Sequence, residues 1–486
     1  MLRKRRIKMA VLSNCKPERV FHYFEEICNI PHPSYHEEEI SAYLVNYAKE
    51  HNLEYYTDEL YNVIMIKEAS EGMENVAPII LQGHMDMVAE QDPDCTKDML
   101  TEGLDLEVVD GYVTAKGTTL GGDDGIAVAM ALALLEDETL KHPRLEVIIT
   151  VSEEVGMEGA AGIDVSMIKG RKLLNLDSEE EGHFLAGCAG GCRMELEYPA
   201  KKEQVKGNLV SVEINDCTGG HSGTEIDKGR ANATLMVNRM LAAAVEVADV
   251  QLVDFVGGTK DNAIPRATSA KVVTTAEAVK AMEAEAAAIK NEFAVTDPEM
   301  KIDIKSQGEA SVEAVSAVDT KRMIQLLSCM PDGVQAMSHD IEGLVETSLN
   351  LGILKLTEEG LNFSCALRSS VDSAKTALMR KVSMVGNAFG CKISTHGQYP
   401  AWEYKRDSSF RDELVALYEE MTGEKALVET LHAGVECGLL ASKLPGLDAV
   451  SIGPEMHDIH TPKERLGIAS TERIYNYVRR VIETSK

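Results

Sequence analysis

Two side chains that can do chemistry follow a short, mostly apolar segment of the chain. The segment covers residues 79–83 and ends in glycine, and His84 and Asp86 come directly after it. Such a segment is typical of a buried strand, and positions i and i+2 of extended backbone point the same way. An imidazole and a carboxylate would then leave one strand end together, where open α/β sheets place their chemistry. A core histidine beside a surface aspartate would explain this one segment equally well.

The same pattern, an apolar strand followed by acidic or imidazole groups, recurs at four further places, which favours a functional site. Asp123 precedes an alanine-rich helix over 126–135 and could simply cap it. Asp124 and the flanking glycines make a bare cap less convincing, because glycines let backbone approach a bound group closely. Two adjacent carboxylates follow the strand over 145–151. The complete set of groups is His84, Asp86, Asp123, Glu153, Glu154, Asp177 and His460.

These groups together predict a metal centre. Five carboxylates in one cleft would repel each other and resist ionisation, and two divalent cations would remove that repulsion better than one. Histidine and carboxylate ligands without thiolate suit zinc, cobalt or manganese. Two ions about 3.5–4 Å apart need a bridging carboxylate and generate hydroxide at neutral pH. The number of groups fits two ions and leaves one carboxylate for acid–base work.

Periodicity predicts an α/β fold that holds these groups, interrupted by a second domain. Helices and strands alternate up to about residue 190, which predicts a central, mostly parallel sheet between helices. Residues 9–190 and 399–486 are expected to form one metal-binding catalytic domain. Residues 191–398 are expected to form an inserted α+β lid domain that resembles two successive units of ferredoxin-like type. Its expected strands cover 208–216, 250–256, 267–274, 300–306, 347–355, 361–368 and 391–396, and its helices 230–246, 275–294, 318–329 and 373–388.

Composition limits the partners and the compartment. The formal charge of −30 repels nucleic acid and anionic membranes, and no apolar run is long enough for a transmembrane helix. The basic residues 1–8 lack the apolar segment of a signal peptide and are expected to be a disordered extension. The ten cysteines show no zinc-binding spacing, so we expect free thiols and a cytoplasmic protein.

Several motifs resemble those of a known enzyme family. The motifs at 84–86, 122–125, 153–156, 177 and 459–462 look like those of the co-catalytic zinc metallopeptidases, which include glutamate carboxypeptidases and aminoacylases. The resemblance runs from Met9 over nearly the whole chain. Within that superfamily, the motifs at 117–121, 368–373 and 433–438 most resemble the aminoacyl-histidine dipeptidases, also called Xaa-His dipeptidases or bacterial carnosinases.

The resemblance implies a ligand set and a catalytic base. Asp123 would bridge two divalent ions, zinc being the metal that the family resemblance implies. The other ligands would be His84 and Asp177 at one site, Glu154 and His460 at the other. His457 competes with His460, which the family motif favours because it directly precedes Thr-Pro. Glu153 would be the general base for hydrolysis by a metal-bridged hydroxide, and Asp86 would fix the tautomer of His84.

The resemblance also implies residues that contact a small peptide substrate. His221, in the lid, would stabilise the oxyanion or hold the substrate carboxylate when the domains close. Arg368 and Asn262 would bind the terminal carboxylate, Glu436 the amino group, and His432 would line the pocket. The expected substrates are unblocked dipeptides, including those with C-terminal histidine. A homodimer through the lid is a further expectation.

Two alternatives stay open at this stage. An aminoacylase, or a broader di- and tripeptide aminopeptidase, could use the same metals. A small-molecule binding protein could use the cleft without turnover. We favour catalysis because a degenerate, non-catalytic member should have lost its base, whereas Glu153 is present.

Overall fold

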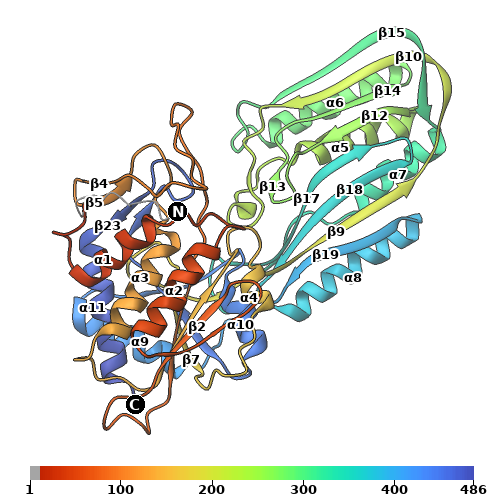
Figure 1. The fold of residues 1–486 in the computed structure, drawn as a ribbon. Coiled ribbons are helices and arrows are strands. Elements are labelled where there is room, and N and C mark those ends of the chain that lie inside the picture. The colour runs from red at the N-terminus through yellow and green to blue at the C-terminus, as the bar shows by residue number, and fades with distance from the viewer. Residues whose placement is uncertain (1–10) are drawn as a thin grey trace. The chain divides into compact units, whose positions relative to one another are not determined.

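The computed structural model describes residues 11–486, and the extension expected at residues 1–8 lies outside them. The chain forms two compact units (Figure 1). Unit 1 runs up to Gly187 and includes Tyr404–Thr430 and Val435–Lys486. Unit 2 comprises Cys188–Glu403 and Leu431–Gly434. Each unit has its own hydrophobic core.

Unit 1 is built on an eight-stranded sheet of order β1-β2-β6-β3-β7-β21-β8-β20. The central strands β6, β3, β7 and β21 are parallel, as predicted, because crossover helices connect them. The pairs β1–β2, β2–β6 and β21–β8 are antiparallel. The strands are β1 (Glu54–Thr57), β2 (Val63–Lys67), β3 (Ile79–His84), β6 (Leu145–Thr150), β7 (Lys172–Asn175), β8 (His183–Cys188), β20 (Leu427–Leu431) and β21 (Asp448–Ser451).

Helix α3 fixes the position of one proposed ligand. It covers Gly122–Glu136 and its residues from Ile126 to Leu135 are all buried, in contact with α1 and β3. Small alanine side chains permit this close packing, and the start of the helix holds Asp123. The other helices of unit 1 are α1 (Glu18–Cys28), α2 (Glu38–Glu50), α4 (Glu158–Gly162), α9 (Ser409–Thr422), α10 (Glu436–Lys443) and α11 (Ile468–Thr484).

A small second sheet of unit 1 carries the C-terminal histidines. Its strand order is β22-β23-β5-β4, and the loop from β22 to β23 contains His460. The strands are β4 (Leu106–Val109), β5 (Tyr112–Ala115), β22 (Met456–His457) and β23 (Arg465–Gly467). Across the described part of the chain, no helix combines the length and the apolar character that crossing a bilayer requires.

Unit 2 contains two units of ferredoxin-like type, each with the order βαββαβ. One unit pairs its strands in the order β15-β10-β14-β12 and the other in the order β17-β18-β9-β19, with all these pairs antiparallel. The first comprises β10 (Lys202–Asn215), α5 (Ala233–Val247), β12 (Gln251–Gly257), β14 (Thr268–Val273), α6 (Ala276–Glu292) and β15 (Lys301–Val315). The second comprises β9 (Gly190–Pro199), α7 (Ala317–Cys329), β17 (Val345–Leu356), β18 (Gly360–Ser369), α8 (Asp372–Phe389) and β19 (Lys392–Tyr399).

The two ferredoxin-like units are nested, whereas the sequence predicted that they follow one another. The unit from β10 to β15 lies inside the other, between β9 and α7. Strands β12 and β17 pair and join the two into one sheet, and β16 (Gly333–Met337) also pairs with β17. The reason for the difference is long-range pairing, because β9 hydrogen-bonds to β18 and β19 rather than to the next strand.

A four-residue segment, 431–434, belongs to unit 2, although the sequence placed it in the catalytic domain. The Ala189 amide donates to the carbonyl oxygens of Leu431 and Ala433 at 3.0 and 3.1 Å. His432 Nε2 lies 2.7 Å from Ser348 Oγ. These contacts, made to residues distant in sequence, explain the assignment.

Candidate active site

The five proposed metal ligands converge in unit 1, where parallel strands end. His84 ends β3, and its Nε2 lies 3.2 Å from Asp123 Oδ1 and 3.6 Å from Asp177 Oδ1. His460 Nε2 lies 3.1 Å from Asp123 Oδ2 and 2.8 Å from Glu154 Oε1. The two oxygens of Asp123 therefore face different imidazoles, which is the arrangement of a carboxylate that bridges two ions.

The tautomer of His84 fits a metal ligand. Its Nδ1 lies 3.0 Å from the backbone oxygen of Asp86, so Nδ1 carries the proton and donates it. The other ring nitrogen, Nε2, faces two carboxylate oxygens, so either a proton on Nε2 or a metal ion in its place must lie between them. His84 also groups with Asp123 and Glu154, and with Asp124 and Asp177, with the ligand atoms of each set within 4.8 Å of one another.

The shifted pKa values of the clustered side chains also indicate that this site favours bound positive charge. Burial opposes a charge on His84 and on His460, yet their carboxylate partners raise the pKa of His84 well above its ordinary value and that of His460 to about 11. Burial, with repulsion from Asp123 and Glu154, raises the pKa of Asp177 to about 6 despite the hydrogen bond to His84. Protons would thus compete for the positions that metal ions would take.

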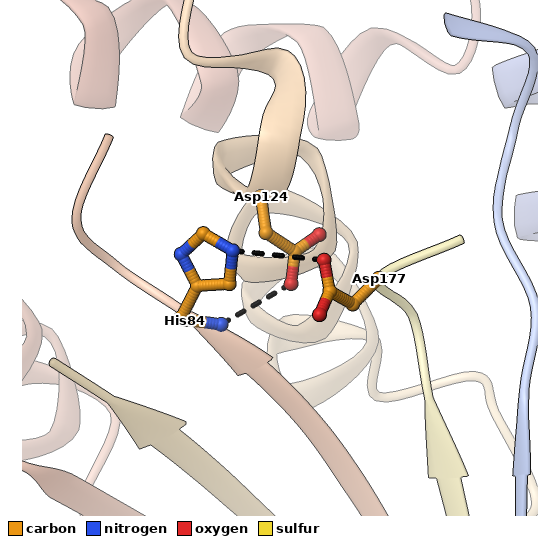
Figure 2. Close-up of side chains that lie close together, drawn as sticks. All are labelled: His84, Asp124 and Asp177. Atoms are coloured by element: carbon orange, nitrogen blue, oxygen red, sulfur yellow. Dashed lines mark hydrogen bonds and ion pairs between the residues drawn. The ribbon is translucent and has the colours of Figure 1, made fainter. Parts of the chain in front are cut away.

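Asp124, which the sequence analysis left without a role, lies directly beside the ligands. Its Oδ2 accepts a hydrogen bond from the His84 amide at 3.1 Å, whereas its buried Oδ1 has no hydrogen-bond partner. Figure 2 shows the carboxylates of Asp124 and Asp177 close together beside His84. A Cβ at Gly83 would lie 2.4 Å from Asp124 Oδ2, so this approach requires glycine. Burial and then repulsion from Asp177 raise the pKa of Asp124 well above its ordinary value.

Glu153 and Glu154 follow a sharp turn at the end of β6. Ser152 has a φ of 52°, in the left-handed region. The Asp86 carboxylate accepts hydrogen bonds from the Glu153 amide at 3.0 Å and the Glu154 amide at 3.4 Å. Burial raises the pKa of Glu153 well above its ordinary value, and nearby carboxylates add to this effect. The geometry thus ties Asp86 to the backbone of both glutamates.

The contact between Asp86 and His84 differs from the one expected. The Asp86 carboxylate lies 3.5 Å from His84 Nδ1, farther away than the backbone oxygen of the same residue. Ser34 Oγ donates to the other Asp86 oxygen at 2.8 Å. The carboxylate contacts the two glutamate amides more closely than the imidazole it was expected to orient.

Glu37 holds the turn before the two glutamates and was missed by the sequence analysis. It is buried, and its Oε1 accepts hydrogen bonds from the amide and the hydroxyl of Ser152 at 3.0 and 2.8 Å. Both donors belong to the residue with left-handed backbone. The two partners are 115 positions apart in the sequence, so no local sequence pattern would reveal this contact.

We expect Glu37→Ala to lower kcat for dipeptide hydrolysis by roughly tenfold, with a smaller change in KM. The reason is that the turn at Ser152, which positions the expected base Glu153, loses two hydrogen bonds of about 1 kcal/mol each. Glu37→Gln should restore most of kcat, since an amide oxygen still accepts these bonds. The exposed neighbour Glu39 provides the control substitution Glu39→Ala. Steady-state kinetics on folded variants makes the measurement. Equal kcat in Glu37→Ala and wild type would contradict the role.

Glu464 is a second carboxylate that the sequence analysis missed. It accepts hydrogen bonds from the backbone amides at the start of α3, at 2.7 Å from Leu120, 3.1 Å from Gly121 and 2.7 Å from Gly122. A carboxylate at this end of a helix is favourable, although burial still raises its pKa to about 7. The side chain anchors the loop that presents Asp123.

Glu436 was expected to contact the substrate amine, and the structure buries it in unit 1. Its Oε2 accepts hydrogen bonds from Gln82 Nε2 at 2.5 Å and Thr150 Oγ1 at 2.6 Å. Its Oε1 is buried without a hydrogen-bond partner, and burial raises its pKa to about 8.

His457, the alternative ligand to His460, lies 3.2 Å from Glu455, outside the cluster of proposed metal ligands.

Unit 2 brings His221, Arg368 and His432 together. His221 Nδ1 accepts hydrogen bonds from the amides of Gly223 and Thr224 at 3.3 and 3.2 Å, so its proton lies on Nε2. A Cβ at Gly223 would lie 3.0 Å from His221 Cε1 and 3.1 Å from Arg368 Nε. That Nε is buried without a partner, while Nη1 donates to the Tyr399 hydroxyl at 3.2 Å. Burial, then Arg368 and His221, lower the pKa of His432 to about 4.

Comparisons with known proteins identify relatives of this chain. The sequence model of peptidase family M20/M25/M40 matches residues 80–484 of this chain. The cytosol non-specific dipeptidase of Escherichia coli strain K12 is 36% identical over 468 residues, which cover 95% of this chain and 96% of that protein. The crystal structure of aminoacylhistidine dipeptidase from Vibrio alginolyticus has a TM-score of 0.91 at 34% identity and covers 98% of each chain. The aminopeptidase PepT from Bacillus cereus, at 16% identity and a TM-score of 0.56, shares the fold.

Proposed function

The chain belongs to peptidase family M20/M25/M40, and on this basis we propose that it is a cytoplasmic, metal-dependent dipeptidase. Its substrates are unblocked dipeptides, including those with C-terminal histidine. The observation that carries the proposal is the carboxylate of Asp123, whose two oxygens face His84 and His460 separately. The names of the Escherichia coli and Vibrio relatives support the substrate class.

The ligand set would hold two divalent ions, with zinc as the first candidate and cobalt or manganese as alternatives. His84 and Asp177 would hold one ion and Glu154 and His460 the other, with Asp123 shared. When bound, the two ions would polarise the scissile carbonyl and generate a water-derived nucleophile at neutral pH. The placement of His84 Nε2 against two carboxylate oxygens and the crowded carboxylates support this assignment.

Glu153 would move the proton in hydrolysis. Its carboxylate would accept a proton from the attacking water and pass it to the nitrogen of the leaving amino acid. Burial raises the pKa of this carboxyl, which makes it a stronger base once it is ionised. Asp86 and Glu37 would keep it aimed, because they bind the backbone of residues 152–154.

Residues of unit 2 would recognise the polar ends of the substrate. His221 Nε2–H would donate to the developing oxyanion, and Arg368 would pair with the terminal carboxylate, with Asn262 beside them. The unpartnered Nε of Arg368 supports this role.

The test compares kcat/KM for a free dipeptide, its N-acetyl form and its C-terminal amide. We expect both blocked forms to be poorer substrates. The C-terminal amide should be poorer by roughly 10- to 100-fold, because it leaves the charged Arg368 without its partner, and a dipeptidase for unblocked substrates should also discriminate against the N-acetyl form. Arg368→Ala should remove the discrimination against the amide, whereas Arg380→Ala, on an exposed position of α8, should keep it. Preference for the N-acetyl form would indicate an aminoacylase, and binding without hydrolysis would indicate a binding protein. Indifference to the amide in wild type would exclude Arg368 from its role.

A further inference from the structure

A cavity in unit 2 is lined by cationic and neutral side chains. Its volume is about 390 Å³, and Lys260, Arg266, His221, Asn262 and Thr259 line it. Among the residues that the structure describes, no carboxylate lines this cavity. The protein as a whole carries a formal charge of −30, so the cavity stands out against the surrounding negative charge and would favour an anion.

The backbone shapes this cavity around a fixed guanidinium group. Arg266 Nε donates to the Cys217 carbonyl oxygen at 3.0 Å. A Cβ at Gly219, whose φ is 66°, would lie 2.3 Å from Arg266 Cγ, so only glycine admits the arginine side chain there. The two-stranded ladder of β11 (Gly220–His221) and β13 (Ala263–Ile264) contributes four lining residues.

The carboxylates beside the cavity pair with cations outside its lining, Glu225 with Arg230 and Asp261 with Arg193. Lys260 is exposed, and no ion pair of its ammonium group occurs within residues 11–486. Asp216 interacts electrostatically with Arg266, but its carboxylate pairs with Lys301 at 2.8 Å. Two cations therefore face a space large enough for an amino-acid side chain.

We propose that this cavity is a subsite for an acidic side chain at the C-terminal position of the dipeptide. The inference rests on the proposed function and adds a substrate preference to it. His221 and Asn262 line the cavity, and Arg368 lies beside the same histidine across Gly223. Arg368 takes the terminal carboxylate, which leaves Lys260 and Arg266 for the carboxylate of an aspartate or glutamate side chain. Inorganic phosphate shares this anionic chemistry and is the alternative occupant.

The test compares Gly-Glu with Gly-Gln, which have the same shape but differ in charge. Wild type should give a higher kcat/KM for Gly-Glu. Lys260→Ala and Arg266→Ala should each reduce the Glu/Gln ratio by about three- to tenfold, as expected for loss of one partly exposed charge-assisted contact. Lys280→Ala, at an exposed position of α6, should leave the ratio unchanged. Lys260→Glu should shift preference from Gly-Glu towards Gly-Lys, a gain that a merely damaged fold cannot produce.

The outcomes separate this inference from the proposed function. Hydrolysis of Gly-Gln with a wild-type Glu/Gln ratio near one would overturn the subsite and leave the dipeptidase intact. A ratio that is insensitive to both Lys260→Ala and Lys260→Glu would also overturn it. Competition by inorganic phosphate that Lys260→Ala abolishes, together with a ratio near one, would assign the cavity to free anions instead. Failure to hydrolyse any dipeptide would overturn both proposals.

Discussion

Glu153→Gln is expected to lower kcat by roughly 10²–10⁴ while metal binding is retained. This is the usual share of general acid–base catalysis, and glutamine keeps the shape of the side chain but cannot accept the proton. Glu153 is also the strand-end carboxylate of β6 that makes no hydrogen bond to His84 or His460 among the contacts described. Single-turnover kinetics and metal analysis of the purified variant would measure the two properties separately.

Two further variants control this result. Glu158→Gln, at an exposed position at the start of α4, should leave both properties unchanged. Glu154→Gln should lower metal content, because Glu154 Oε1 lies 2.8 Å from His460 Nε2. Loss of metal in Glu153→Gln and its retention in Glu154→Gln would reverse the two assignments.

Removal of metal by a chelator is expected to abolish dipeptide hydrolysis, and zinc, cobalt or manganese should restore it. The reason is that the neighbouring carboxylates repel one another unless a cation lies between them, and the two imidazole nitrogens can coordinate such a cation. Metal binding should also raise the melting temperature of the metal-free protein, because an ion that binds the folded state stabilises it. Activity and thermal unfolding before and after metal addition give two independent measurements. Full activity of protein shown to be metal-free would contradict the entire metal-centre assignment.

The convergence of His84, Glu154 and Asp177 could be predicted from sequence because each lies at or just beyond the end of a local apolar strand pattern. His84 and Asp177 come after strands, and parallel strands end at one edge of a sheet, so short segments suffice to bring them together. Glu37 and Glu464 could not be predicted in this way. Each acts on backbone amides of a distant segment, and neither its residue type nor its neighbours indicate which segment that is.

The roles of individual carboxylates were harder to predict than their location. Asp86 was expected to orient His84, and its carboxylate lies 3.5 Å from His84 Nδ1, but it lies closer to the Glu153 amide and to Ser34 Oγ. Glu436 was expected to bind the substrate amine, whereas it is completely buried against Gln82 and Thr150. Periodicity identifies strands and helices, but the direction of one side chain depends on packing by residues far away in the chain.

The nested arrangement of unit 2 has a consequence for biosynthesis. The strands from β10 to β15 find all their ferredoxin-type partners within residues 202–315, so these strand pairs can form before the rest of unit 2 has been synthesised. Strand β9 is made earlier but must wait for β18 and β19, which are made after the whole inserted part. Strand β7 can pair with β3 on one edge as soon as it is made, but its other edge must wait for β21 near the C-terminus. The last-synthesised segments therefore complete sheets that the first-synthesised segments begin, whereas the inserted ferredoxin-like part has its own strand partners earlier.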